Sequence, residues 1–312
     1  MNRVVSAGMG ESLPAGLRAA DILLLRSPGP SAWAVRLFDG AEVDRAALFL
    51  GAGRVAEVEG DAVVFRSLEE CLAGTERAVV RRMKEPAAME PVLGRAEALR
   101  DAHVTGRPEV LLALLSSSRR LRPTPSLRLL QRSILEAGAA ALAQPAPMTG
   151  AQFVWRCYED ALPEASDVYT VRLNELHNLE VVSGIPMVPG AGVARRLGRG
   201  VHPESLLAWA AQPLVRSRLG STTRSSAVPP LDEALARYQL EVRDGAPALQ
   251  PGRAEGDELL ASLQIFALAF GGAHPALARS KLPAPLEMLF RSAADLCTAG
   301  DLLRSDDLFT LE

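Results

Sequence analysis

The chain has 312 residues, of which 48% are apolar and 4% aromatic, and its formal net charge is -3. This length fits one elaborated domain or two domains, and the abundance of Ala, Leu and Val favours a mainly helical or α+β protein. Lys and Arg form nothing longer than pairs, which argues against a nucleic-acid-binding protein, and no apolar run reaches the roughly 18 residues of a membrane span.

The first part of the chain is rich in predicted strands. Residues 21–26 are a short apolar run ended by Ser-Pro-Gly-Pro, as expected of a buried strand followed by a loop. Three further runs are separated by glycine-containing turns, and their spacing predicts a tight antiparallel meander: 46–50, 54–59 and 63–66. One or two helical turns and a further strand complete this β-rich part, at 67–72 and 78–82.

From Pro86 onward the apolar residues recur with a helical period. Breaks that contain proline divide four predicted helices: 89–102, 108–117, 126–142 and 149–162. Farther along, two segments rich in turn-forming residues are predicted as loops, 183–199 and 217–230, and four more helices are predicted, 203–211, 231–242, 255–271 and 283–296. A sheet with a group of helices beside it indicates the α+β class.

Cysteine and histidine spacing gives no sign of a metal or redox site. Cys71, Cys157 and Cys297 form no CxxC pair and no ligand spacing with the four histidines, which are His103, His177, His202 and His274. We expect the thiols to be buried as small apolar groups. The first 17 residues lack the apolar core of a signal peptide, so a cytoplasmic protein without cofactor or metal is predicted.

Five stretches occur in the order of known family motifs: 20–24 (ADILL), 44–51 (DRAALFLG), 53–57 (GRVAE), 150–154 (GAQFV) and 297–305 (CTAGDLLRS). Together they resemble the permuted papain-like branch of the NlpC/P60 superfamily, the YiiX/YebB-like cysteine hydrolases. The resemblance implies a permuted papain-like fold, with a small antiparallel sheet packed on helices. It implies a core over 18–162, a helical and loop insertion over 163–293, and a C-terminal motif that returns to the core over 294–312.

The residues that would catalyse hydrolysis in that family are missing here. The resemblance places the general base at Arg45, a third polar group at Glu57 and the nucleophilic cysteine at Gly150. A guanidinium stays protonated and cannot act as a base, and glycine offers no nucleophile. The catalytic residues of this chain, if it has any, are therefore unknown, and the sequence predicts a degenerate member.

The helix that would present the nucleophile is nevertheless predicted to begin normally. Thr149 and Gln152 form a capping box, and Met148 with Phe153 is placed for a hydrophobic staple. A helix start of this kind can stabilise a thiolate, because its dipole and free N–H groups favour negative charge. The platform for the nucleophile is thus predicted without the nucleophile itself.

Two questions about individual side chains stay open at this point. Arg45 and Glu57 either form an ion pair across adjacent strands, in place of the family's catalytic pair, or are separate charges that meet solvent. Cys157 follows Gly150 by seven residues on nearly the same helix face, and we expect it to point into the core. It is nonetheless the fallback nucleophile. Thr149 has a hydroxyl but no evident base.

Three functions are compatible with these observations. The first is a catalytically inactive pseudoenzyme kept as a binding or assembly module, whose vestigial cleft holds an acyl or peptidyl group with Arg45 on its carboxylate. The second is an active cysteine amidase, peptidase or acyltransferase with a relocated nucleophile. The third is the docking of a protein partner by the insertion, residues 163–293.

Overall fold

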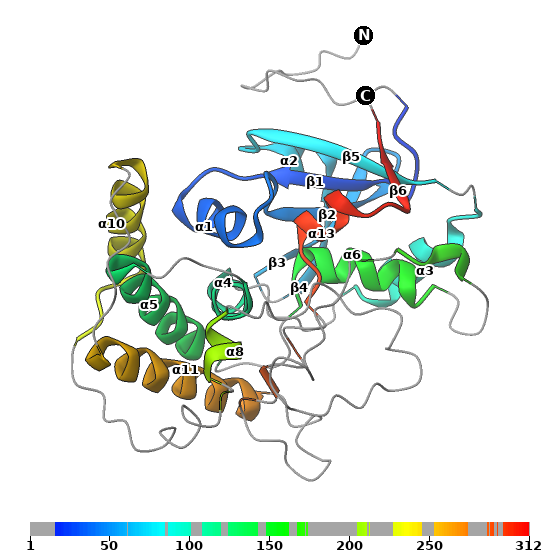
Figure 1. Ribbon diagram of the computed structural model, residues 1–312. Coiled ribbons are helices and arrows are strands. Elements are labelled where there is room, and N and C mark those ends of the chain that lie inside the picture. Colours follow the sequence, from blue (N-terminus) through cyan, green and yellow to red (C-terminus); the bar gives the residue numbers. More distant parts are fainter. Residues whose placement is uncertain are drawn as a thin grey trace. The chain divides into compact units, whose positions relative to one another are not determined.

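The computed structural model shows an α+β protein with two compact units (Figure 1). The first unit comprises Met1–Gly106, Pro147–Asn174 and Cys297–Glu312, and the second comprises Arg107–Ala146 and Glu175–Leu296. The residues described below are 16–60, 62–84, 87–100, 108–119, 124–142, 148–161, 167–171, 173, 205–210, 212, 227–244, 253–273, 286, 288–289, 292 and 296–311.

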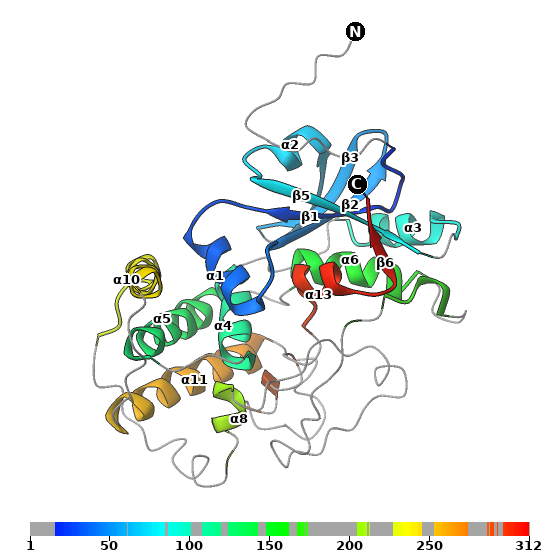
Figure 2. The same ribbon diagram turned by 45° about the horizontal axis from the view of Figure 1, so that its top comes forward.

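A six-stranded antiparallel open sheet, in the order β4-β3-β2-β1-β5-β6, is the frame of the first unit (Figure 2). The strands are β1 (Ile22–Arg26), β2 (Arg45–Gly51), β3 (Arg54–Glu59), β4 (Ala62–Ser67), β5 (Arg77–Met83) and β6 (Leu308–Thr310). The predicted meander is confirmed as β2, β3 and β4, and the predicted strand at 78–82 is confirmed as β5. The three-residue β6 was not predicted from the sequence.

The described residues of the first unit form the α-helices α1 (Pro30–Asp39), α2 (Leu68–Leu72), α3 (Glu90–Ala98), α6 (Gly150–Glu159) and α13 (Ala299–Arg304). A short 3-10 helix, η1 (Asp167–Tyr169), follows α6. The loop predicted after β1 is present at residues 27–29, but the helix α1 that follows it was not predicted. Pro30 occupies its first turn, where proline is tolerated, and buried Ala34, Val35 and Phe38 anchor one side of the helix. Gly40 ends it in a left-handed conformation.

Each face of the sheet carries its own apolar cluster, because successive side chains of a strand point to opposite sides. We call these sides the α6 face and the α2 face. On the α6 face, the strands contribute Ile22, Leu24, Ala46, Leu48 and Ala56, which cluster with residues of α6. On the α2 face, the alternate residues Leu23, Leu25, Ala47, Phe49 and Val55 cluster with Cys71 of α2.

The second unit is helical in its described part. Its helices are α4 (Pro108–Ser118), α5 (Pro125–Ala141), α8 (Leu206–Ala210), α10 (Leu231–Asp244) and α11 (Arg253–Ala273). α5 packs against α4, α10 and α11, and Gly138 permits this close approach, since a Cβ there would lie 2.9 Å from the Ala113 Cβ. Most of the predicted loops, and most of the predicted helix at 283–296, lie outside the described residues.

The packing of α5 determines where the division between the units falls. The sequence assigned residues 18–162 to a single core, but residues 107–146 cluster with 175–296 because the partners of α5 include α10 and α11. The other boundaries of the first unit are Asn174 and Cys297, where the sequence predicted 162 and 294.

Candidate functional site

The start of α6 has the local structure that the sequence predicts. The Thr149 hydroxyl accepts a hydrogen bond from the Gln152 N–H at 3.0 Å, and the Gln152 side chain accepts one from the Thr149 N–H at 3.4 Å, which confirms the capping box. Met148 and Phe153 are both buried in the cluster of the α6 face, as expected of a staple. The helix platform is therefore present.

Gly150, however, has no space beside it for a thiol. A Cβ atom at this position would lie only 2.7 Å from the carbonyl oxygen of Ala46, a backbone atom of β2 that cannot rotate away. A second carbonyl oxygen, that of Cys297, accepts a hydrogen bond from the Thr149 hydroxyl at 3.1 Å. Two backbone carbonyl oxygens thus lie close to the end of α6 at which the family's cysteine would stand.

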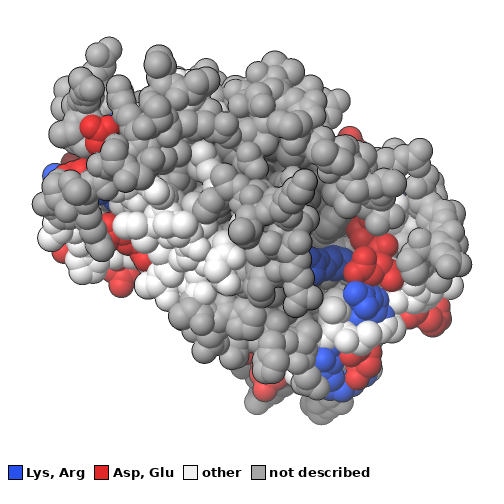
Figure 3. Space-filling model, turned by 90° about the horizontal axis from the view of Figure 1, so that it is seen from below, with Lys and Arg blue, Asp and Glu red and all other residues white. Residues whose placement is uncertain are grey.

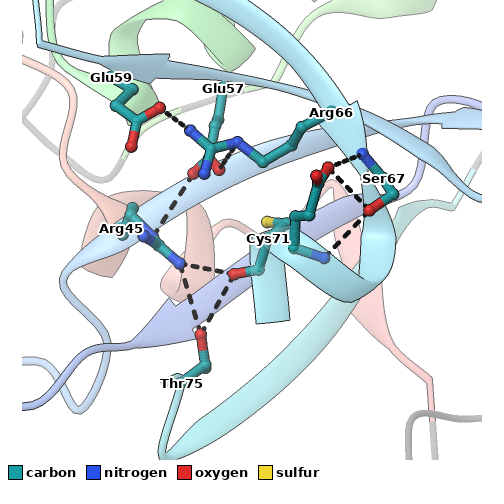
Figure 4. Close-up of polar contacts among 8 residues, drawn as sticks. Arg45, Glu57, Glu59, Arg66, Ser67, Cys71 and Thr75 are labelled. Atoms are coloured by element: carbon teal, nitrogen blue, oxygen red, sulfur yellow. Dashed lines mark hydrogen bonds and ion pairs between the residues drawn. The ribbon is translucent and has the colours of Figure 1, made fainter. Parts of the chain in front are cut away.

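The Arg45 side chain lies on the opposite side of the sheet from Gly150. Because Ala46 belongs to the α6 face, its neighbour Arg45 points to the α2 face. There its Nη2 atom donates to the Cys71 carbonyl oxygen at 2.8 Å and to the Thr75 hydroxyl at 3.4 Å (Figure 4). The backbone brings these two family-equivalent positions together, but their side chains do not share a cleft.

Glu57 lies beside Arg45, and the ion pair that the sequence left open is present. Arg45 Nε lies 3.5 Å from one carboxylate oxygen of Glu57, and Arg66 Nε lies 3.0 Å from the other (Figure 4). The carboxylate is almost fully buried, whereas about a third of the Arg45 side chain, 34%, is exposed. Arg66 also pairs with Glu59. This cluster therefore neutralises a buried acid.

Arg66 was missed as a partner of Glu57 although the sequence carries the signal. The sequence has a turn signal at Gly60-Asp61, and the register of β3 with β4 places Val64 opposite Glu57 and Arg66 opposite Val55. Arg66 is therefore a diagonal neighbour of Glu57 on the same face, within reach of a long side chain. Counting outward from the turn would have found it.

None of the three cysteines forms a disulfide, and all three are buried. Burial raises the pKa of Cys157 to about 12. Burial, together with the nearby Glu57 carboxylate, also raises the pKa of Cys71 to about 12. The Cys297 thiol lies 3.8 Å from the Thr298 carbonyl oxygen. Because the thiolate is the nucleophilic form, Cys71 and Cys157 lie in surroundings that suppress reactivity.

The C-terminal motif attaches α13 to the end of α1. Thr298 and Asp301 form a capping box at the start of α13, and the Gly300 N–H donates to the buried Asp39 carboxylate at 3.1 Å. A Cβ at Gly300 would overlap this carboxylate and lie 2.5 Å from the Ala41 Cβ. The glycine of the motif is thus required by packing, and the motif has a structural role.

Other kinds of site find no support in the described residues. No group of three or more His, Cys, Asp and Glu side chains among them is placed to hold a metal, and all four histidines lie outside them. None of the described helices combines the length and apolarity needed to cross a bilayer. On the right of Figure 3, the described acidic and basic side chains lie next to one another, whereas on the left the described charged side chains are mainly scattered acidic ones.

Comparisons with known proteins give little further information. No protein-family model matches the chain, and no curated protein matches it. Among solved structures, it is similar to the metalloprotein yiiX from Escherichia coli O157:H7, with 16% identity and a TM-score of 0.30 over 47% of this chain and 67% of that chain. A likeness this weak carries no argument. The predicted family, ligand and protein partner therefore remain predictions.

Proposed function

We propose that this chain is a catalytically inactive relative of the permuted papain-like NlpC/P60 hydrolases, and that its first unit serves as a binding or assembly module. The family assignment rests on the five ordered motifs. The observation that carries the loss of activity is the start of α6, where Gly150 lies against the Ala46 carbonyl while Arg45 points to the other side of the sheet.

Hydrolysis by a cysteine enzyme needs a thiolate within hydrogen-bond reach of a base. The family's thiol position is a glycine without space for a side chain. The family's base position is a guanidinium, which cannot take up a proton and is held to Glu57. Either loss alone costs several orders of magnitude in rate. The two together leave no part of the catalytic pair.

The rival proposal is an active enzyme with a relocated nucleophile, and the burial of the three cysteines argues against it. Cys71 and Cys157 have raised pKa values, and Cys297 is fully buried. The Thr149 hydroxyl accepts a hydrogen bond from the Gln152 N–H, and its own O–H donates to the Cys297 carbonyl, which is not a base.

The ligand of such a module is more readily a protein than an acyl or peptidyl group. Arg45 was the residue expected to bind a ligand carboxylate, but in the structure its carboxylate partner is Glu57 of the same chain. A ligand acid would have to displace a buried partner that has a second cation, Arg66, on its other oxygen. We therefore favour assembly with a protein over capture of a small acid.

The test combines thiol labelling with an activity assay on the full chain. Native protein at pH 8 is treated with iodoacetamide and its mass is followed, with urea-unfolded protein, which should gain three adducts, as the reference. We expect no native adduct on the same timescale and no thiol-dependent turnover of amide or ester substrates. Turnover that is abolished by Cys157→Ala or by labelling of one cysteine would establish the relocated nucleophile instead.

A further inference from the structure

The chain returns from the second unit to the first at two places, after residue 146 and after Leu296. Each return is followed within three residues by a helix with a threonine N-cap, Thr149 for α6 and Thr298 for α13. The Thr149 hydroxyl donates to the Cys297 carbonyl at 3.1 Å. One hydrogen bond therefore joins the two returning passages just where each becomes part of the first unit.

Residues 297–311, which we call the C-terminal clasp, contain α13 and β6. Their first attachment is the end of α1, where the Asp39 carboxylate accepts from the Gly300 N–H at 3.1 Å and lies 3.4 Å from Arg304 Nη2. Asp39 and Asp301 are both buried. This attachment is polar, directional and hidden from water.

The second attachment of the clasp is Arg81 of β5. Its Nη2 atom donates to the carbonyl oxygens of Ser305 at 2.5 Å and Leu308 at 2.7 Å, and its Nη1 atom donates to the Thr310 hydroxyl at 2.9 Å. The Arg81 side chain thus spans the end of α13 and the whole of β6. Backbone pairing of β5 with β6 adds to this attachment.

Neither element of the clasp is long enough to persist alone. α13 has six residues and β6 has three, and isolated helices or strands of such lengths do not form in water. Each is therefore ordered only while its polar attachments and the packing of Ala299, Leu302 and Leu308 in the cluster of the α6 face hold, and the loss of one attachment weakens the other. We propose that the clasp opens and closes as one body, and that the Thr149–Cys297 hydrogen bond couples its state to the first turn of α6.

This proposal does not depend on the proposed loss of catalysis. It assigns a regulatory device to the first unit: opening of the clasp would loosen α13, β6 and the start of α6 together. Opening would uncover the Asp39 carboxylate and the β5 edge between Arg81 and Met83, both of which the clasp now pairs. Thr149 acts in this device as a positioning residue.

The test is amide hydrogen exchange, followed by mass spectrometry on the full chain with Arg81→Gln. Loss of the charged donors should raise exchange about tenfold or more in peptides that cover α13, β6 and the first turn of α6, while β1 stays protected. Arg77→Gln is the matched control, because Arg77 lies on the same strand but pairs with exposed Glu42. Exchange that rises in β6 alone would overturn the proposal.

Two milder variants keep the test decisive if Arg81→Gln does not fold. Thr310→Val removes one acceptor at the far end of the clasp and should raise exchange about threefold in all three regions. Thr149→Asp keeps the N-cap acceptor but cannot donate to the Cys297 carbonyl, so it should loosen the clasp, whereas Thr149→Ser keeps the donor and should match the parent. Equal exchange in Thr149→Asp and Thr149→Ser would exclude the coupling.

Discussion

Two helices of the first unit, α6 and α13, begin in the same way and differ in what lies before them. Both have a threonine N-cap with a complete capping box, and both carry an early glycine without space for a Cβ. Gly150 of α6 meets a backbone carbonyl of β2, whereas Gly300 of α13 meets the carboxylate of Asp39. The capping residues determine the backbone conformation at the start of each helix, whereas the groups packed against that start determine what it can bind.

The difference bears on chemistry because the N-terminal end of a helix favours negative charge. α13 receives a full negative charge there, from Asp39. Near the start of α6 lie the carbonyl oxygens of Ala46 and Cys297, which are neutral dipoles. Where a hydrolase of the resembled family would stabilise a thiolate, this chain packs backbone against backbone. The helix start with the anion is the one that fastens the C-terminal clasp.

The largest effect should come from Gly300→Ala. The added methyl group would overlap Asp39 and press on Ala41, so α13 must move, and we expect a loss of about 3 kcal/mol in the free energy of unfolding of the first unit. Urea denaturation measures this loss. Gly94→Ala in α3 is the control, since nothing lies within 4 Å of a Cβ there, and it should stabilise by about 1 kcal/mol. Equal effects would refute the packing argument.

Gly150→Ala should lower the free energy of unfolding by slightly less, about 2 kcal/mol. Its added methyl group would clash with one atom, the carbonyl oxygen of Ala46, and β2 would have to shift to relieve this contact. The double variant Gly150→Cys with Arg45→His restores both family residues in sequence but not in space. It should show no thiol-dependent hydrolysis of amide or ester substrates. Turnover in this variant that Gly150→Ala lacks would show that the start of α6 can open into a working cleft.

Asp39→Asn tests the anion itself, because asparagine keeps an acceptor for Gly300 but removes the charge facing Arg304 and the helix end. We expect a loss of about 2 kcal/mol in unfolding free energy. Asp160→Asn is a matched control in an exposed ion pair with Arg95, and it should cost less than about 0.5 kcal/mol. A similar small cost for both variants would mean that the charge at α13 is unimportant.

The local structure of both helix starts could be predicted, whereas their surroundings could not. The capping box at Thr149 is a contact between residues three positions apart, so the sequence shows it directly. The contact of Gly150 with Ala46 joins residues about a hundred positions apart and depends on how closely α6 approaches β2. In the same way, β6 was missed because Arg81, far away in the chain, supplies the contacts that hold it.

The Arg45–Glu57 pair shows an intermediate case. The two charges and their adjacent strands were predicted, and the pair exists. Its placement on the α2 face follows from the alternation of side chains along β2, because Ala46 faces α6 and its neighbour Arg45 must therefore point to the opposite side. To assign Arg45 to one face of the sheet, one must know which helix covers each face, and only the packed structure shows this. Arg66, in contrast, was within reach of the sequence through the β3–β4 register.

The smallest predicted effect concerns Cys157, which lies behind the start of α6. Burial raises the pKa of its thiol from 9.0 to about 12, so the folded state holds the proton more tightly than the unfolded state. This contribution to stability is complete below pH 9 and is lost as the pH rises toward 12. At pH 10 the loss should be about 1.4 kcal/mol relative to pH 8. Comparing urea denaturation of the parent with that of Cys157→Ala at both values isolates this loss, since other titrating groups are common to both proteins. If the two proteins lose stability equally, the thiol is already ionised or exposed, and the start of α6 would have a reactive group behind it after all.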